Sequence, residues 1–367
     1  MTSISAALIV RNEAEFLEDC LRSLAGNVDE IVVVDTGSQD KTIEIASRFP
    51  VKLDHFKWCD DFSAARNFAL ERASGDWLLY IDADERLEIP DHDAFRMMLA
   101  DRRKVGWRLR LHPRVGWTAY SELRLFRNDP RIRFEGIIHE NPWSGIAAVA
   151  AADGFEVATS DCVLHHVGYE PDQRRKNARN IPLLRALLAR EPEHLFCWWH
   201  LGDCLRLAGD DDGAEDAWRN GVVRLRALDP EHRLLRDSIL YLALLRHRYA
   251  RGINVDELVA EALALFPTNM ALQLMSARFA VDRGDLELAQ PILERLVAID
   301  GETFFDPEIA YDKALFGHLP AELLALCHFR RNRFDEAAVL YLMAARNSPA
   351  PAACELKACL AQLRAAG

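Results

Sequence analysis

The first part of the chain alternates short apolar runs with segments whose apolar residues recur at helical spacing. The apolar runs predict strands at 4–10, 30–34, 51–56 and 77–81. The intervening segments predict helices at about 13–24, 41–48 and 63–73. Because strands and helices alternate, we expect an α/β domain with a mostly parallel sheet and helices on both faces. Short strands at 106–111, 122–126 and 157–164 predict a mixed, antiparallel part of the same domain.

The second part of the chain is almost wholly helical in pattern and carries a weak internal repeat. Large and small residues fall at the positions of a tetratricopeptide unit at Trp198, Leu201, Gly202, Ala214 and Trp218. The second half of another unit is matched by Ala337, Tyr341, Ala344 and Pro349, and weaker matches cover 239–267 and 272–301. Small residues allow two antiparallel helices to approach, and large ones fill the gap to the next pair. A non-repeating helical bundle is the alternative.

The length of 367 residues favours two domains over a single core. We expect one domain at 1–170, a connecting helix at 171–195, and tetratricopeptide-like repeats at 196–367. The formal net charge of -12 argues against a general nucleic-acid surface. The eight cysteines form no CxxC pair, which is typical of reduced thiols in a cytoplasmic protein. Since no leader and no apolar stretch of bilayer length is seen, we expect no transmembrane segment, and any membrane association would be peripheral.

Carboxylates follow two of the predicted strands. Asp35 ends the run 31–34, and Asp82 and Asp84 follow the run 77–81. Ligands bind at the carboxyl edge of an open α/β sheet, where carboxylates suit a hydroxyl or a cation. Asp82 and Asp84 are two residues apart, so in extended geometry they face the same side and could share Mg²⁺ or Mn²⁺. The alternative is that they only end a strand and cap a helix.

The two commonest nucleotide-binding patterns are missing from the sequence. No GxGxxG follows the first strand, and no GxxxxGK[ST] occurs. A phosphatase that uses paired aspartates would carry them after its first strand, not after a later one. A dinucleotide-dependent dehydrogenase, a P-loop enzyme and such a phosphatase are therefore all disfavoured.

A series of ordered motifs resembles the family 2 glycosyltransferases of GT-A fold. The motifs are IVRNE (9–13), VDTGS (34–38), FSAARN (62–67), IDADE (81–85), RLFR (124–127), IHE (138–140) and HVGY (166–169). The series is most similar to the bacterial branch of lipopolysaccharide-core and bacteriocin-peptide glycosyltransferases, some of which carry helical repeats. The resemblance covers about residues 1 to 180. It implies transfer of a hexose from a nucleotide-diphosphate sugar, with a UDP-hexose as donor.

The resemblance implies a metal site for Mn²⁺ or Mg²⁺. Asp84 would bind the metal directly, and Asp82 would reach the metal through water or bind the ribose. His166 would be a third ligand, since imidazole binds Mn²⁺. A cation placed there would stabilise the negative charge that grows on the departing diphosphate. For His166, a histidine of the core or the surface is the alternative.

Further residues match the nucleotide-binding part of the family pattern. Asp35 would accept hydrogen bonds from the base or ribose, and Glu13 would lie near the nucleoside. Arg66 matches a nucleotide-contacting arginine, while Lys176 and Arg179 would close over the diphosphate. The alternative for Glu13 is a charge in the first turn of a helix. The alternative for Arg66, Lys176 and Arg179 is a charge on a solvated helix face.

An inverting enzyme needs a general base for the acceptor hydroxyl. Glu140 occupies the family's region for this carboxylate and is favoured over His139, although many members carry Glu-Asp where this chain has His-Glu. A His-Glu pair that only holds a turn is the alternative. The acceptor implied is a glycan, a lipid-linked saccharide or a peptide. The competing hypothesis is an inactive nucleotide-binding or repeat-scaffold protein, against which the set of Asp35, Asp82 and Asp84 weighs.

Overall fold

The computed structural model describes residues 2–168 and 174–366, without the side chains of 174–176. The chain divides into two compact units. The first comprises Met1–Val115, Tyr120–Pro192 and Leu207–Gly209, and the second comprises Gly116–Ala119, Glu193–Arg206 and Asp210–Gly367. Each unit has its own hydrophobic clusters, so each is described by itself.

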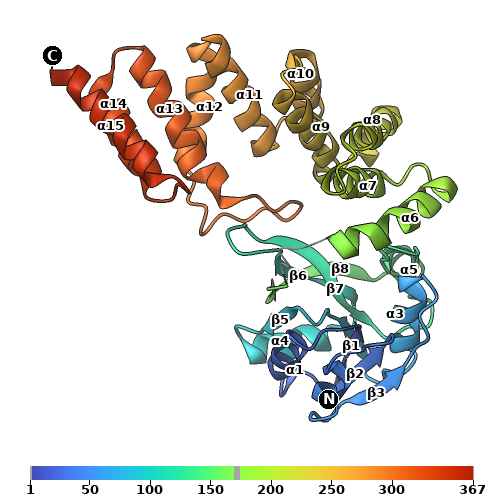
Figure 1. Ribbon diagram of the computed structural model, residues 1–367. Coiled ribbons are helices and arrows are strands. Elements are labelled where there is room, and N and C mark those ends of the chain that lie inside the picture. The colour runs from blue at the N-terminus through green and yellow to red at the C-terminus, as the bar shows by residue number, and fades with distance from the viewer. Residues whose placement is uncertain (1, 169–173, 367) are drawn as a thin grey trace. The chain divides into compact units, whose positions relative to one another are not determined.

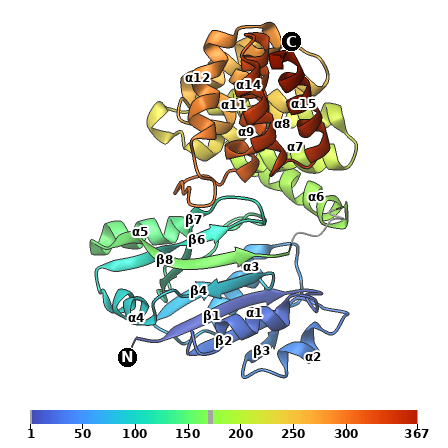
Figure 2. The same cartoon turned by 90° about the vertical axis from the view of Figure 1, so that its left-hand side faces the viewer.

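The first unit is built on one mixed sheet. In the described residues its strands are β1 (Ile4–Val10), β2 (Glu30–Asp35), β3 (Lys52–His55), β4 (Trp77–Tyr80), β5 (Glu85–Glu88), β6 (Lys104–His112), β7 (Tyr120–Arg127) and β8 (Glu156–His166). They lie in the order β3-β2-β1-β4-β7-β6-β8-β5. Figure 2 shows the part of this order that runs from β4 through β1 and β2 to β3. The pairs from β3 to β4 are parallel, and β7 is antiparallel to both β4 and β6. The predicted parallel half and mixed half are both confirmed.

Helices cover both faces of this sheet. The apolar face of β1 that carries Ile4 and Leu8 packs with α1 (Leu17–Leu24), α2 (Thr42–Ala46) and α4 (His92–Ala100). The opposite face packs with α3 (Phe62–Leu70) and α5 (Trp143–Asp153). Helix α6 (Arg174–Arg190) completes the helices of this unit that the structure describes. The expected three-layer arrangement is therefore present.

Several predicted bounds were wrong, and three elements were not predicted. Helix α1 begins at Leu17 rather than near residue 13, because the Glu13 carbonyl accepts from Phe16 and Leu17 in a turn that precedes it. Helix α3 ends at Leu70 rather than near residue 73. Elements β5, α4 and α5 lie in segments for which no strand or helix was predicted. The hydrophobic signal is short in β5 and almost uniform around α5, so neither shows a clear period.

The second unit consists mainly of helices in consecutive antiparallel pairs (Figure 1). Its described α-helices are α7 (Leu195–Leu207), α8 (Asp211–Ala227), α9 (Ile239–Ala250), α10 (Asp256–Leu265), α11 (Met270–Arg283), α12 (Leu286–Val297), α13 (His318–Arg330), α14 (Phe334–Ala345) and α15 (Pro351–Ala366).

The repeat packing follows the predicted pattern of small and large residues. A Cβ on Gly202 would lie 2.3 Å from Nε1 of Trp218, so glycine lets the indole lie against α7. The same indole nitrogen donates to the Trp199 carbonyl at 3.0 Å. Ala214 and Ala337 are fully buried. The prediction of tetratricopeptide-like helix pairs is confirmed.

Among the described helices, none combines the length and the apolar composition that a membrane span requires.

Candidate active site

The carboxyl ends of β1 and β2 are joined by side-chain hydrogen bonds. The Asp35 carboxylate, which is buried, accepts from the backbone N–H groups of Gly37 and Ser38 at 2.9 and 3.2 Å. Asn12 has a φ of 58°, and its backbone N–H donates to Ser38 Oγ at 2.9 Å. Asp35 is thus held by its own turn at the edge where it was predicted to bind a nucleoside. Glu13 lies in the same joined segment, where its N–H donates to a threonine hydroxyl at 2.7 Å.

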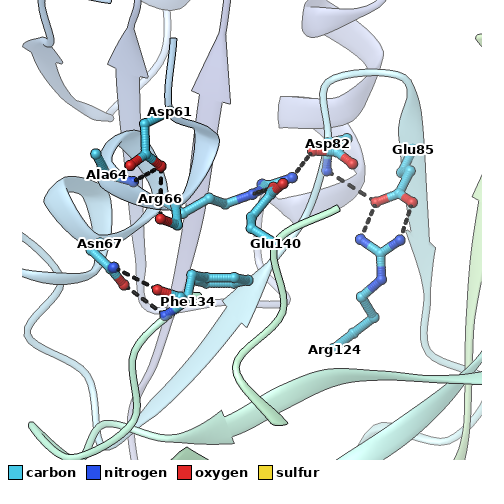
Figure 3. Close-up of polar contacts among 10 residues, drawn as sticks. Asp61, Ala64, Arg66, Asn67, Asp82, Glu85, Arg124, Phe134 and Glu140 are labelled. Carbon is cyan, nitrogen blue, oxygen red and sulfur yellow. Dashed lines mark hydrogen bonds and ion pairs between the residues drawn. The ribbon is translucent and has the colours of Figure 1, made fainter. Parts of the chain in front are cut away.

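Arg66 lies at the centre of the candidate site, between two carboxylates from distant parts of the chain (Figure 3). Its Nη2 donates to Asp82 Oδ1 at 2.6 Å, and its Nε donates to Glu140 Oε1 at 3.0 Å. The Arg66 side chain is 9% exposed and that of Glu140 is 10% exposed. In the described structure, Arg66 Nη1 is buried and has no hydrogen-bond partner. The structure therefore brings three predicted site residues together and leaves one donor unsatisfied.

Helix α3 and the segment before Glu140 position this arginine. Asp61 caps α3 by accepting from the Ala64 N–H at 3.0 Å. One turn further on, the Asn67 side chain donates to the Phe134 carbonyl at 2.9 Å and accepts from the Phe134 N–H at 2.8 Å (Figure 3). This reciprocal pair of hydrogen bonds fixes the 134–140 segment against the same helix that carries Arg66.

Glu140 and His139 lie on a tight loop. The backbone groups of Glu135 and Asn141 bond to each other in both directions, at 3.1 and 3.2 Å, and so close the loop. His139 has a φ of 55°, in the left-handed region that is uncommon for residues other than glycine. Such conformations persist where surrounding structure holds them, and they occur often at functional sites. Of the two, Glu140 is the residue that this loop brings to Arg66.

The two arginines near Asp82 determine its charge. Partial burial opposes ionisation, but the guanidinium charges of Arg66 and Arg124 outweigh burial and hold the pKa of Asp82 at about 2. Its side chain is 38% exposed, so an approaching ligand can reach this carboxylate. Asp82 is therefore an ionised, accessible hydrogen-bond acceptor at neutral pH.

Asp84 and His166 contact each other across the β5–β8 strand pair. His166 Nε2 lies 3.1 Å from Asp84 Oδ2, and this hydrogen bond raises the pKa of His166, although burial opposes the rise. Residue 168 must be small here, because a Cβ on Gly168 would lie 2.3 Å from Asp84 Oδ2. Gly168 was quoted in a motif but not predicted as a site residue. Its small size lets the end of β8 approach Asp84 closely.

The predicted metal ligands fall into two groups. Asp84 and His166 contact each other, while Asp82 is hydrogen-bonded to Arg66. Among the described residues, no three His, Cys, Asp or Glu side chains are arranged so that they could hold a metal ion. The three-ligand site consequently stays a prediction. Asp84 and His166 still offer an oxygen and a nitrogen donor at one place.

A buried ion pair that was not predicted as part of the site lies beside Asp82. Arg124 donates to Glu85 through both terminal nitrogens, at 2.9 and 3.1 Å (Figure 3). Burial raises the pKa of Glu85, and the facing guanidinium opposes that rise. A sequence signal existed, because Arg124 interrupts the apolar run of β7, and a lone arginine in a buried strand needs an acidic partner.

The predicted phosphate-binding cations belong to α6. Arg179 is placed with its guanidinium 5.2 Å from the ring centroid of Phe62, at the start of α3. Burial, with a smaller contribution from the nearby charge of Arg11, lowers the pKa of Arg179. The side chain of Lys176 lies outside the described residues, so its predicted role stays a prediction.

Part of the first unit matches a known protein family. Residues 5–100 match the model of Glycosyl transferase family 2. A TPR repeat-containing protein of Synechococcus elongatus is 38% identical over 255 residues, 68% of this chain and 62% of that protein. The prophage-derived glycosyltransferase SunS of Bacillus subtilis is 26% identical over 279 residues, 69% of this chain and 65% of that protein. The matched region thus spans just under two thirds of each of these relatives.

Solved structures also show similarity. S. aureus TarS 1–349 has a TM-score of 0.40 at 14% identity, covering 72% of this chain and 91% of that chain. Glucosyl-3-phosphoglycerate synthase from Mycobacterium tuberculosis, in complex with Mn²⁺, UDP and glucosyl-3-phosphoglycerate, has a TM-score of 0.36 at 17% identity, covering 52% of this chain and 80% of that chain.

Proposed function

We propose that this protein is a metal-dependent inverting glycosyltransferase, because residues 5–100 match the model of Glycosyl transferase family 2. It moves a hexose from a nucleotide-diphosphate sugar, with UDP-hexoses as the first donors to test, to a glycan, a lipid-linked saccharide or a peptide. The observation that carries the proposal is the junction of Arg66 with Asp82 and Glu140 at one edge of the sheet. A cytoplasmic location and a peripheral contact with membranes stay predictions.

The charges at this edge suit a nucleotide sugar. Asp35 and Asp82 are fixed acceptors for the hydroxyl and N–H groups of a nucleoside. Arg66 Nη1 is a buried donor without a partner in the described structure, and an oxygen of the donor substrate would satisfy it. Arg179 offers a further positive charge from α6. A bound nucleotide sugar therefore supplies the partners that these groups lack.

Asp84 and His166 are the residues that would hold a divalent metal. Mg²⁺ in nucleotide sites usually takes one or two protein carboxylates and fills its shell with water and phosphate oxygens, so a small protein donor set fits. When bound, the metal would neutralise the negative charge that develops on the leaving diphosphate. Asp82 would bind the ribose or a water molecule coordinated by the metal ion. His166 provides the nitrogen donor that Mn²⁺ accepts.

Glu140 is the proposed general base. In an inverting transfer the base takes the acceptor's hydroxyl proton as the new bond to the anomeric carbon forms and the bond to the diphosphate breaks. Arg66 donates to one Glu140 oxygen, Oε1, and so orients the carboxyl group. Replacement of Glu140 by glutamine should lower transfer at least about 100-fold and leave nucleotide binding intact.

Calorimetry of UDP and UDP-sugars, with and without Mn²⁺, tests the proposal. Mn²⁺ should tighten binding to the wild type at least about 10-fold, and Asp84→Ala should abolish that gain. Asp54→Ala is the matched control, since Asp54 lies in the edge strand β3 and pairs with Arg72 outside the site. Absence of nucleotide binding, or binding indifferent to both Mn²⁺ and Asp84→Ala, would contradict the proposal.

A donor screen separates an active enzyme from an inactive nucleotide-binding scaffold. Hydrolysis of nucleotide sugars without acceptor would identify the base and the sugar together. Binding that is accompanied by neither hydrolysis nor transfer, across UDP-, GDP-, ADP- and TDP-sugars, would favour the scaffold.

A further inference from the structure

Glu85 and Arg124 form a buried pair directly behind the Asp82–Asp84 turn. Glu85 is 1% exposed and Arg124 is 8% exposed. The pair joins β5 to β7, which are not neighbours in the sheet. Arg124 also lies over the ring of Tyr80, 4.7 Å from its centroid, while Arg66 lies 5.4 Å from the same centroid. Tyr80 is thus in contact with both guanidinium groups that bear on Asp82.

Hydrogen bonds tie this pair to the turn itself. Glu85 Oε2 accepts from the Asp82 backbone N–H at 3.0 Å, and the Glu85 N–H donates to the Asp82 carbonyl at 3.0 Å. Arg124 holds the same carboxylate through two parallel hydrogen bonds. The Asp84 carbonyl accepts from the Val167 N–H at 2.8 Å, which fixes the far end of the turn to β8. The Glu85 and Arg124 side chains therefore fix the turn that carries Asp82 and Asp84, and neither side chain has another role in the proposed function.

We propose that Glu85 and Arg124 are positioning residues that hold Asp82 and Asp84 in the orientation needed for the metal and the nucleotide. This inference rests on the proposed function and adds two residues to it. Glu85 acts through the Asp82 N–H and the short turn, and Arg124 acts by fixing the Glu85 carboxylate in a bidentate geometry. A bidentate pair constrains direction as well as distance, which a single hydrogen bond does less well.

A purely stabilising role predicts a different response to substitution. A buried ion pair replaced by apolar residues of similar volume is often neutral or stabilising, because the desolvation cost of the charges disappears. Loss of stability is therefore a poor measure of what this pair contributes. Loss of order in the turn, and of metal and nucleotide affinity, distinguishes positioning from stabilisation.

The test compares the double variant Glu85→Leu/Arg124→Met with the wild-type full chain. We expect unfolding at or above the wild-type temperature. In the same variant, the Mn²⁺ concentration for half-maximal nucleotide binding should rise at least about 10-fold, the loss seen when residues behind a metal ligand are removed. Hydrogen exchange at the Asp82 amide should become faster, since its acceptor is gone. Arg124→Lys keeps the positive charge but lacks the planar guanidinium group. Its Mn²⁺ requirement and its exchange rate at the Asp82 amide should lie between those of the wild type and the double variant.

A second double variant, Lys104→Met/Glu156→Leu, is the matched control. This pair joins β6 and β8 at 2.6 Å, with Glu156 70% exposed, and does not contact the turn. It should leave the Mn²⁺ requirement and the Asp82 exchange rate unchanged. The positioning role would be overturned if the Glu85→Leu/Arg124→Met protein folds and shows the same Mn²⁺ dependence and the same exchange rate at the Asp82 amide as the wild type. Failure of the wild type itself to bind nucleotide would instead overturn the proposed function.

Discussion

Substitution of Arg66 by methionine is the most informative single perturbation of the candidate site. Methionine retains much of the apolar stem but removes the guanidinium, leaving Asp82 and Glu140 without their shared partner. The free energy of unfolding of the first unit should fall. Removal of one partner of a buried ion pair leaves the other charge buried, with nothing to offset its cost of desolvation.

The magnitude follows from the exposure of each partner. Glu140 is 10% exposed, so its stranded carboxylate should cost about 3 kcal/mol, the lower end for a broken buried pair. Asp82 is 38% exposed and can be hydrated, so its share should be about 1 kcal/mol. The sum is about 4 kcal/mol. At about 2 to 4 °C per kcal/mol for a domain of this size, the melting temperature should drop by about 8 to 16 °C.

Native-state hydrogen exchange of peptides from α3 and β4 is the appropriate assay, since the two units need not unfold together. Arg72→Met is the control. Arg72 lies just after α3 and pairs with Asp54 at the surface, where loss of an ion pair should cost about 1 kcal/mol or less. A second variant, Arg66→Met/Glu140→Gln, removes the stranded charge and should recover part of the lost stability.

The reasoning would be refuted by either of two results. Arg66→Met could prove no more destabilising than Arg72→Met, which would mean that water or neighbouring groups compensate both carboxylates. Alternatively, Glu140→Gln could fail to recover stability in the Arg66→Met background, which would mean that Glu140 and Arg66 are not energetically coupled.

Two further predictions concern stability outside the site. Burial opposes ionisation of Glu30, yet hydrogen bonds from Lys52 and nearby serines lower its pKa to about 2, so its contribution is present above pH 4.5 and is lost as the pH falls toward 2. In urea titrations, Glu30→Gln should therefore cost about 1 to 2 kcal/mol at pH 7 and almost nothing near pH 2, and a pH-independent difference would contradict this assignment. Gly202→Ala should destabilise the repeat unit by about 3 kcal/mol through its clash with Trp218. Gly252→Ala, which meets no atom within 4 Å but has a φ of 71°, should cost only about 1 kcal/mol, and equal losses would refute the packing argument.

The candidate site was predictable in part. Asp35 and Asp82 could be placed at one sheet edge because each follows an apolar run, and parallel neighbours end at the same edge. Arg66 and Glu140 could be named only through the family resemblance. Their contact joins residues 74 positions apart, and no local pattern reports on such a pair.

Glu85 was missed because its immediate surroundings in the sequence are polar. It stands between Asp84 and Arg86, which is typical of a solvated turn. In the structure it is among the most buried charged side chains of those described. The reason is that the β4–β5 turn directs it toward β7, where Arg124 supplies two donors. Burial of a charge depends on finding its partner, and that partner lies 39 residues away.

The local patterns of this chain were sufficient for most of the element types, though not for β5, α4 and α5, and for the two-part organisation and the position of the acidic strand ends. Those properties depend on the period of apolar residues and on where each run stops, both of which are local. Which carboxylate meets Arg66, which meets Arg124 and which meets His166 was decided by the tertiary structure. Each of these ion pairs joins separate elements, so its energy exists only after the sheet has brought the strand ends together.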